Sequence, residues 1–277
     1  SMLPAGADGT PASDDFIPNT ITDCAVGNIV WSTIFAYDFE KMPNGPKTMA
    51  DFFDLENFPG KRGLRRGPKP NLEMALMADG VPADYVYIVL STEEGVDRAF
   101  AKLDTIKDHI VHWSAGSKPL ELVKSGEVVM STGWNGRFFN AAVGEGAPIV
   151  QVWDGQGLDY EYFALVKGGP NQEDAMKALA MMTSTEMLAG SAKYIAYAPW
   201  RKSSIAVMQA GEPWYKDGKT NMVPHMPTAP ANLKRYFLVD AEYWADNGTE
   251  LGEKWEAMKA SIKSVSYTHL RAHETSI

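Results

Sequence analysis

The chain has 277 residues, of which 45% are apolar and 22% are charged, and its formal net charge is −9 at pH 7. This composition is typical of a globular protein, and the length allows one large domain or two smaller ones. The negative charge argues against nucleic acid as a partner, because binding to a phosphate backbone needs clustered lysines and arginines. The single cysteine, Cys24, excludes an intramolecular disulfide and a cysteine metal cluster.

The first part of the chain predicts strands and helices in alternation. Residues Asn28–Tyr37 are rich in β-branched and aromatic side chains, which favours a strand. Thr48 can cap a short helix that ends near Leu55, and Asn71–Asp79 predicts a second helix. Asp84–Ser91 has strand propensity, although a short apolar run of this kind also occurs in helices.

The longest predicted helix follows a capping box of Ser91 and Glu94, and its apolar residues keep a helical period from Val96 to Ile110. The elements predicted after it are a helix over Pro119–Ser125 that ends at Gly126, strands over Val128–Thr132, Pro148–Trp153 and Tyr160–Lys167, helices over Asp174–Met182 and Glu186–Tyr194, and a last helix capped by Thr249. This alternation favours an α/β fold with largely parallel sheets.

The two ends of the chain depart from the alternating pattern. Ser1–Asp15 lacks the basic start and apolar run of a signal peptide. Ser264–Ile277 has no clear period and resembles a translated sequencing adapter, so we expect it to be a non-native tail. No stretch between them approaches the about 18 consecutive apolar residues of a membrane-spanning helix.

Two polar segments leave alternatives open. Asp104, Asp108, His109 and His112 have helical spacings that could place metal ligands on neighbouring turns, but an amphipathic helix with solvated acids explains them more simply. Gly63–Gly67 (GLRRG) is basic and precedes a predicted helix, so it is compatible with an anion site or with a solvated turn.

Aromatic side chains near the predicted strand ends point to a binding site. They are Trp134, Trp153, Tyr160, Tyr162, Tyr197, Trp200 and Trp244, and the acids Asp154, Asp159 and Glu161 lie among them. Aromatic faces beside carboxylates suit an organic cation, although aromatics are also ordinary core residues. On a strand, Asp159 and Glu161 share one face and Tyr160 and Tyr162 the other, so only one of these pairs can line a cleft.

Four segments resemble the spermidine/putrescine-type substrate-binding proteins of ABC importers. In chain order they are KTMADFFDLENFPGKRGL (Lys47–Leu64), MSTGWNGRFFNAA (Met130–Ala142), DGQGLDYEYFALVKGGPNQEDAMKAL (Asp154–Leu179) and KYIAYAPWRKSS (Lys193–Ser204). The resemblance rests on the order and spacing of these segments, and it extends from about Cys24 to Ser261.

Proteins of this family have two α/β lobes joined by a hinge, and the ligand is held when the lobes close over a cleft. The resemblance implies this two-lobed periplasmic binding protein fold of type II, with an incomplete first lobe. The implied parts are a first-lobe remnant over 16–37 and 157–200, a second lobe over 38–156, C-terminal helical segments over 201–263 that pack across the lobes, and the tail over 264–277. We expect the first lobe to leave an open sheet edge, and the chain to bind weakly or to pair with a second copy.

The resemblance also carries site residues. Trp134 matches a tryptophan that lies against the ligand's methylenes, Glu161 matches an acid that pairs with a ligand ammonium, and Tyr197 matches a tyrosine of the cleft. The complete set of expected ligand-binding residues is Trp134, Asn135, Asp159, Glu161, Tyr197, Arg66 and Trp244.

Three positions depart from the polyamine binders. Gly67 and Pro70 stand where those proteins have acids, and Asp159 replaces an aromatic residue. The loss of two carboxylates close to Arg66 argues against a long polyamine. It favours a shorter cation or a zwitterion, whose ammonium would pair with Glu161 and whose carboxylate would pair with Arg66.

The resemblance therefore implies the periplasmic solute-binding component of an ABC transporter, which captures a small nitrogenous solute, either a polyamine-like cation or a zwitterion, and delivers it to a membrane permease. No catalysis, metal or cofactor is expected, and the signal peptide of the full-length protein would lie outside this sequence. One alternative is a metal-dependent hydrolase that uses Asp104, Asp108, His109 and His112. Another is a sensor-type binding protein without a transport role.

Overall fold

The computed structural model describes the backbone of residues 2–18 and 20–274, and the side chains of these residues up to Ala260. The chain divides into two compact units. Unit 1 comprises Ser1–Thr33, Trp134–Ala147 and Leu158–Arg235, and unit 2 comprises Ile34–Gly133, Pro148–Gly157 and Tyr236–Ile277. Each unit combines strands with helices, which confirms the predicted α/β class.

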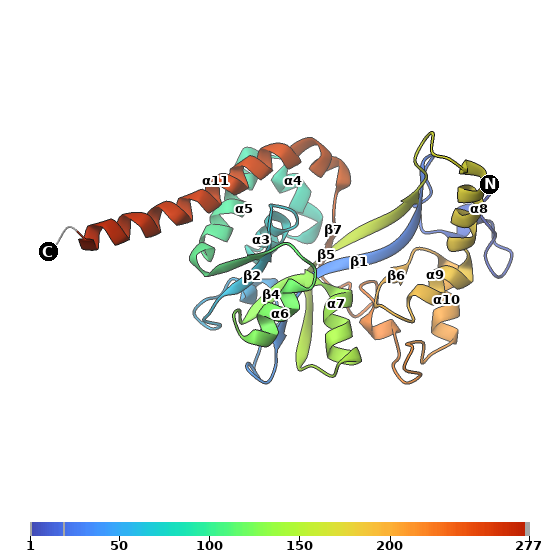
Figure 1. The fold of residues 1–277 in the computed structure, drawn as a ribbon, viewed down its shortest axis with the longest axis horizontal. Helices are drawn as coiled ribbons and strands as arrows, with labels where there is room; N and C mark the ends of the chain where they lie inside the picture. The colour runs from blue at the N-terminus through green and yellow to red at the C-terminus, as the bar shows by residue number, and fades with distance from the viewer. Residues whose placement is uncertain (1, 19, 275–277) are drawn as a thin grey trace. The chain divides into compact units, whose positions relative to one another are not determined.

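Unit 2 is built on short parallel strands with helices packed around them (Figure 1). Strand β2 (Arg62–Arg65) pairs in parallel with β3 (Ile110–Trp113) and with β4 (Met130–Trp134). The other elements are α2 (Met49–Phe52), α3 (Asn71–Ala78), a 3-10 turn (Ala83–Tyr85), α4 (Val86–Leu90), α5 (Glu93–Asp104), a second 3-10 turn (Lys107–His109), α6 (Lys118–Ser125), β7 (Tyr236–Leu238) and α11 (Ala241–Glu274). Every residue of α3 is buried, so this helix forms the centre of the unit's apolar core.

Unit 1 contains the N-terminal segment and the helices between β5 and β7. Its elements are α1 (Ala12–Asp15), α7 (Asn135–Phe139) with a π-helical turn (Asn140–Gly144), α8 (Gln172–Met182), α9 (Thr185–Ser191), β6 (Ala198–Pro199), α10 (Lys202–Ala210) and a 3-10 turn (Val223–His225). Helices α9 and α10 pack against each other and against β6 (Figure 1). Strand β6 in turn pairs antiparallel with β1, with Val30 opposite Ala198.

Two long strands, β1 (Ala25–Asp38) and β5 (Ile149–Ala164), have residues in both units. Hydrogen-bonded neighbours follow the order β3-β2-β4-β1-β5-β7, and β6 pairs with β1. The sequence predicts two strands where β5 is continuous, and that prediction is wrong. Its glycines make room for packing instead of forming a turn, because a Cβ atom at Gly157 would lie 2.6 Å from the ring of Phe237.

Several predicted helix ends are confirmed by their caps. Thr48 caps α2 in a capping box with Asp51, whose side chain accepts from the backbone N–H of Thr48. Helix α6 ends at Gly126, which adopts the left-handed conformation that glycine tolerates best. These signals are local in sequence, so the sequence alone could place them.

The segment 84–91 is helical, so the predicted strand there is wrong. A 3-10 turn leads directly into α4, and Val86 and Leu90 are buried one helical turn apart against the core. Helix α4 packs against α3 and α5. The apolar residues of this run therefore follow a helical period that a stretch of eight residues does not distinguish from a buried strand.

The longest predicted helix is shorter than its apolar pattern suggests. Helix α5 begins after Thr92, whose side chain accepts from the backbone N–H of Gly95, and it ends at Asp104. The predicted cap at Ser91 is thus one residue too early. Ile110, which the pattern assigned to the helix, begins β3. His109 and His112 therefore do not lie on the long helix.

Helix α11 begins at Ala241, eight residues before the predicted cap at Thr249. Asp240 precedes it, and its side chain accepts from the backbone N–H of Tyr243. The backbone of α11 continues as helix to Glu274, past the predicted break at Ser264. The whole of the predicted non-native tail lies outside the described side chains, and residues 275–277 lie outside the described residues. Along the described chain, no helix is long and apolar enough to cross a membrane.

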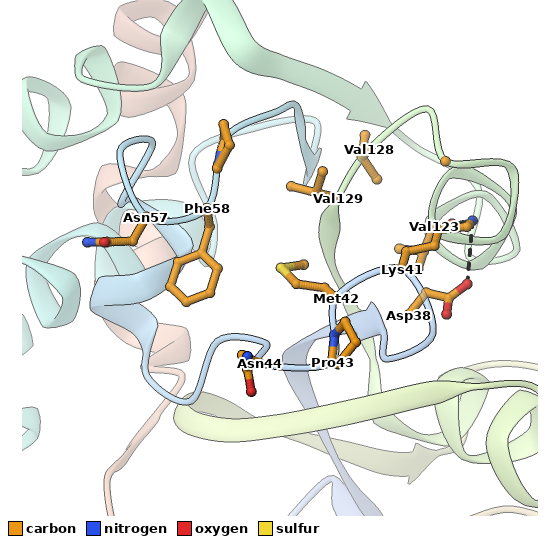
Figure 2. Close-up of a pocket in the computed structure, with 12 residues that line it drawn as sticks. Asp38, Lys41, Met42, Pro43, Asn44, Asn57, Phe58, Val123, Val128 and Val129 are labelled. Atoms are coloured by element: carbon orange, nitrogen blue, oxygen red, sulfur yellow. Dashed lines mark hydrogen bonds and ion pairs between the residues drawn. The ribbon is translucent and has the colours of Figure 1, made fainter.

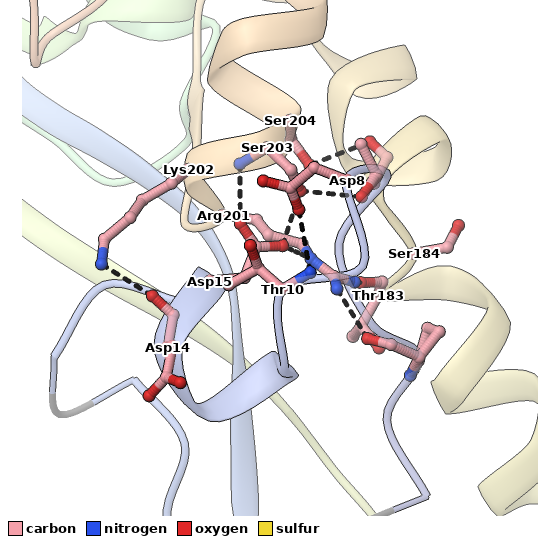
Figure 3. A network of polar contacts seen from close by, with 12 residues as sticks. Asp8, Thr10, Asp14, Asp15, Thr183, Ser184, Arg201, Lys202, Ser203 and Ser204 are labelled. Carbon is pink, nitrogen blue, oxygen red and sulfur yellow. Dashed lines mark hydrogen bonds and ion pairs between the residues drawn. The ribbon is translucent and has the colours of Figure 1, made fainter.

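The segment predicted to form one C-terminal set, residues 201–263, is divided between the two units after Arg235. In unit 1, Arg201 anchors the N-terminal segment (Figure 3). Its guanidinium donates to Asp15, to the carbonyl of Thr183 and to the carbonyl of Pro4. This network ties the first residues of the chain to the start of α10.

Candidate functional site

The predicted acids lie on the second half of β5, in unit 1. Tyr160 packs against Trp200 with ring centroids 4.4 Å apart, and the indole of Trp200 donates to the carbonyl of Ile29 at 2.9 Å. Tyr160 is therefore engaged in the packing of the unit, whereas Tyr162 on the same strand face is 38% exposed. On the other face, Glu161 is exposed and Asp159 is half-buried.

Trp134 ends β4 and contacts a second tryptophan of unit 1. Its ring centroid lies 5.7 Å from that of Trp31 on β1, and the two planes meet at 74°. Both indoles are half-buried. This edge-to-face arrangement is the favoured one for aromatic pairs, and it leaves part of each ring accessible.

Asn135 follows Trp134 and has no solvent exposure. Its Oδ1 accepts from the backbone N–H of Ser32 at 3.0 Å, and its Nδ2 donates to the carbonyl of Ala196 at 2.6 Å. The side-chain amide is therefore bonded to the backbone of two other segments.

Tyr197 lies next to the start of α7. A Cβ atom at Gly136 would lie 2.6 Å from the ring of Tyr197, so glycine permits this close approach. Burial raises the pKa of Tyr197 to about 12, while the positive charge of Arg137 acts to lower that pKa and the negative charge of Glu161 acts to raise it. Arg137 and Glu161 are thus both within electrostatic reach of the Tyr197 hydroxyl.

Arg137 is a candidate site residue that sequence reasoning missed. Its side chain is exposed on the first turn of α7, and within the described chain it forms no ion pair or hydrogen bond, nor does the side chain of Glu161. The available signal was a basic residue directly after Trp134-Asn135-Gly136, where a buried strand gives way to a helix. Such a position is a common place for ligand-binding residues in α/β folds.

The remaining two predicted residues, Arg66 and Trp244, belong to unit 2. Trp244 packs against the core, and its indole N–H donates to Oε1 of Glu73 at 2.7 Å. Glu73 is completely buried, also accepts from the hydroxyl of Tyr87 at 2.8 Å, and has a pKa that burial raises to about 7. Trp244 is therefore engaged inside unit 2.

Arg66 is exposed and lines a cavity of about 360 Å³. The other charged or titratable residues of that cavity are Lys107, Asp108, His112, Glu256 and Lys259. The neighbouring Gly67 has a φ of 105°, a conformation that disfavours any residue with a Cβ. The side-chain amide of Asn71 donates to the carbonyl of Gly67 and fixes this turn. The backbone conformation therefore explains the glycine at position 67 without reference to a ligand.

The structure does not bring Asp104, Asp108, His109 and His112 into one site. Asp104 pairs with Lys107 at 2.9 Å, and Asp108 and His109 are exposed on the 3-10 turn. His112 lies on β3, with its ring centroid 5.6 Å from that of Trp255. Among the described residues, no group of three or more potential ligands is placed to hold a metal ion.

Unit 2 also contains a cavity of about 440 Å³, which none of the seven predicted site residues lines (Figure 2). Apolar side chains, among them Met42, Phe58 and Val129, form its walls. The one ammonium at its edge, that of Lys41, donates to the carbonyls of Val123 and Lys124 and lies 3.4 Å from a carboxylate oxygen of Asp38. Lys41 thus stabilises the C-terminus of α6, and its charge is already neutralised.

The family described as bacterial extracellular solute-binding protein matches residues 3–227. The γ-aminobutyric acid (GABA)-binding protein of Pseudomonas aeruginosa is 44% identical over 252 residues, which cover 91% of this chain and 68% of that protein.

Two solved structures resemble the fold closely. The PBP MotA of A. tumefaciens B6, in complex with glucopine, superposes with a TM-score of 0.79 at 32% identity, over 93% of this chain and 77% of that one. The Atu4243 GABA receptor superposes with a TM-score of 0.75 at 31% identity, over 90% of this chain and 72% of that one. The chain therefore belongs to the bacterial extracellular solute-binding proteins, the solute-binding components of ABC transporters.

Proposed function

We propose that this chain captures a short ω-amino acid of the GABA type and delivers it to an ABC permease. The observation that carries the proposal is that two opposite charges, Glu161 and Arg137, both act on the hydroxyl of Tyr197, and that neither side chain forms an ion pair or hydrogen bond among the described residues. Glu161 binds the ammonium of the ligand, and Arg137 binds its carboxylate through charge-assisted hydrogen bonds. The likeness to a GABA-binding protein and to a GABA receptor supports the same ligand class.

The charge pattern argues against a polyamine. A diamine with one ammonium at Glu161 would place its second ammonium near Arg137, where two like charges repel each other. An ω-amino acid of the same length meets an opposite charge at both ends. A binding site discriminates through such repulsive contacts as well as through attractive ones.

Aromatic side chains cover the methylenes between the two charges. Trp134 and Tyr197 are both partly accessible in unit 1, and their rings bury the apolar part of the ligand. The face of Trp134 also attracts the ammonium through a cation–π interaction. Asp159, on the same strand face as Glu161, adds negative charge at the ammonium end.

Arg66 and Trp244 are the two predicted ligand residues of unit 2. Arg66 is exposed, and the indole of Trp244 is bonded to Glu73. The ligand is released unchanged to the permease, so the chain performs no catalysis and needs no cofactor, and the protein works in the periplasm.

A ligand panel tests the proposal. The chain is titrated by calorimetry, and its melting temperature is followed, with GABA, 5-aminopentanoate, putrescine, spermidine, butylamine and butyrate. GABA or 5-aminopentanoate should bind most tightly and raise the melting temperature most, because a ligand that binds the folded state stabilises it. Preferential binding of putrescine or spermidine would overturn the proposal. So would equal binding of butylamine and GABA, since that would show no carboxylate site.

A further inference from the structure

The amide of Asn135 joins three separate segments of unit 1. It lies at the first residue of α7, accepts from Ser32 on β1, and donates to Ala196 in the turn before β6. A ligand contact would require an exposed polar atom, and this side chain has no exposed surface. Its position between the two aromatic residues of the proposed site calls for another role.

We infer that Asn135 is a positioning residue, which fixes Trp134 and Tyr197 relative to each other and so sets the length of ligand that the site accepts. The inference rests on the proposed function, because it concerns the selectivity of that site.

The Tyr197 side of the site depends on the bond to Ala196. The backbone N–H of Tyr197 donates to the carbonyl of Ile195 at 2.9 Å, which makes a tight turn with Ala196 at its centre. Strand β6 follows at once and is paired with β1. The hydrogen bond from the side chain of Asn135 to the carbonyl of Ala196 thus attaches this turn to α7. The contact between Tyr197 and Gly136 depends on this bond.

The Trp134 side depends on the bond to Ser32. Trp31 precedes Ser32 on β1, and Trp134 precedes Asn135, so the bond between Asn135 and Ser32 holds the two backbone segments that carry the indoles. The two rings contact each other edge to face as a result. With both bonds in place, the distance between Trp134 and Tyr197 is set before any ligand enters.

A site that is formed in advance loses less conformational freedom when it binds, and it rejects ligands of the wrong length. Removal of the amide should therefore reduce discrimination between ω-amino acids of different length. A residue that only stabilises the fold would lower the melting temperature and leave that discrimination unchanged.

The experiment compares Asn135→Ala with Asn232→Ala. Asn232 is another buried amide of unit 1, and it donates to the carbonyls of Pro224 and Met226, away from the proposed ligand residues. Each variant is titrated with β-alanine, GABA and 5-aminopentanoate by calorimetry. The circular dichroism of the free protein is recorded as well, and the variant Trp134→Phe identifies the signal of the Trp31–Trp134 pair.

The selectivity ratio is the affinity for the preferred ω-amino acid divided by the affinity for the next one. Asn135→Ala should lower this ratio by about tenfold and remove the circular dichroism signal of the tryptophan pair. Asn232→Ala should change neither. Gly136→Ala, which displaces Tyr197 and keeps both bonds of Asn135, should lose selectivity and retain the tryptophan signal. It also replaces Asn135→Ala in the test if that variant does not fold.

The inference is overturned if the selectivity ratio and the tryptophan signal of Asn135→Ala match those of Asn232→Ala, or if Gly136→Ala keeps the selectivity of the unaltered chain. If none of the three ω-amino acids binds the unaltered chain, the proposed function fails. The spectra still decide in that case, because an intact tryptophan signal in Asn135→Ala refutes the positioning role and its loss supports it.

Discussion

Arg201 and Asp15 lie 186 positions apart in the sequence and form an ion pair in unit 1, with 2.5 Å between Nε of the arginine and Oδ2 of the acid. The side chain of Arg201 is fully buried and that of Asp15 is 4% exposed. Burial alone would raise the pKa of Asp15, but hydrogen bonds from Ser203 and Arg201 hold it below its ordinary value.

Asp15→Ala should destabilise the chain by about 3–5 kcal/mol, because it leaves the guanidinium of Arg201 buried without its counter-charge. The free energy of unfolding in urea measures this effect. Asp14→Ala is the matched control, since Lys202 bonds to the backbone carbonyl of Asp14 and not to its carboxylate. A loss of under 1 kcal/mol in Asp15→Ala would show that Arg201 finds other partners.

Glu73 should give the stability of the chain a specific pH dependence. Burial raises its pKa from 4.5 to about 7, so between these values the folded state holds a proton that the unfolded state has released. The contribution of Glu73 to stability therefore falls as the pH rises from about 4.5 to 7, by about 3 kcal/mol in total, and is constant above that window.

The measurement is the pH dependence of unfolding in the unaltered chain and in Glu73→Gln. Burial lowers the pKa values of His112 and His225, so the contribution of these two histidines to the stability of the chain falls as the pH falls. Both proteins contain these histidines, so the difference between their stabilities isolates the effect of Glu73. The Gln variant should gain stability relative to the unaltered chain as the pH rises from 4.5 to 7. A difference that does not vary with pH would contradict the raised pKa of Glu73.

Substitution of the two proposed ligand charges should have opposite effects on ligand preference. Glu161→Gln should weaken the binding of GABA and butylamine by about ten- to a hundredfold, because it removes the partner of the ammonium group. The binding of butyrate, which has no ammonium, should not change. Arg137→Gln should weaken the binding of GABA and butyrate to a similar degree, and it should raise the affinity for putrescine relative to that for GABA. Glu173→Gln on α8, where Glu173 pairs with Lys177, is the control. Equal losses for all ligands in both variants would exclude these roles.

Helix α8 should promote self-association. It has no buried residue, although it carries Met176, Leu179, Met181 and Met182, and Met181 is 61% exposed. Exposed apolar surfaces of this kind usually mark an interaction site. Light scattering after size exclusion should show a mass that rises with concentration, and Met181→Gln together with Met182→Gln should reduce it. A monomer at all concentrations would refute the association.

The parts of the fold that were predictable from sequence depend on neighbouring residues. The caps at Thr48 and Gly126 each follow from a few consecutive residues, and both are confirmed. The wrong predictions depend on distant partners. The continuity of β5 is explained by Phe237, which occupies the space beside Gly157, and α4 is a helix because it packs on α3 and α5.

The candidate site shows the same division. The sequence provided Trp134, Glu161 and Tyr197 from their places in recognisable segments, and the roles of these residues stay predictions. Arg137 was missed because its relation to Tyr197 and Glu161 arises only when the segments 134–137, 159–161 and 195–197 come together in unit 1. Asn135 could be located from sequence, but its bonds to Ser32 and Ala196 could not.

The exposed thiol of Cys24, at the residue before β1, gives this chain a natural labelling position. Since the sequence has no other cysteine, a maleimide dye attaches at one known place without any substitution. Cys24 borders a groove of about 460 Å³ whose other walls include Met176 and Leu179 of α8. A solvatochromic dye there would shift its emission when a second molecule covers the groove, and would give an optical readout of assembly at concentrations too low for scattering.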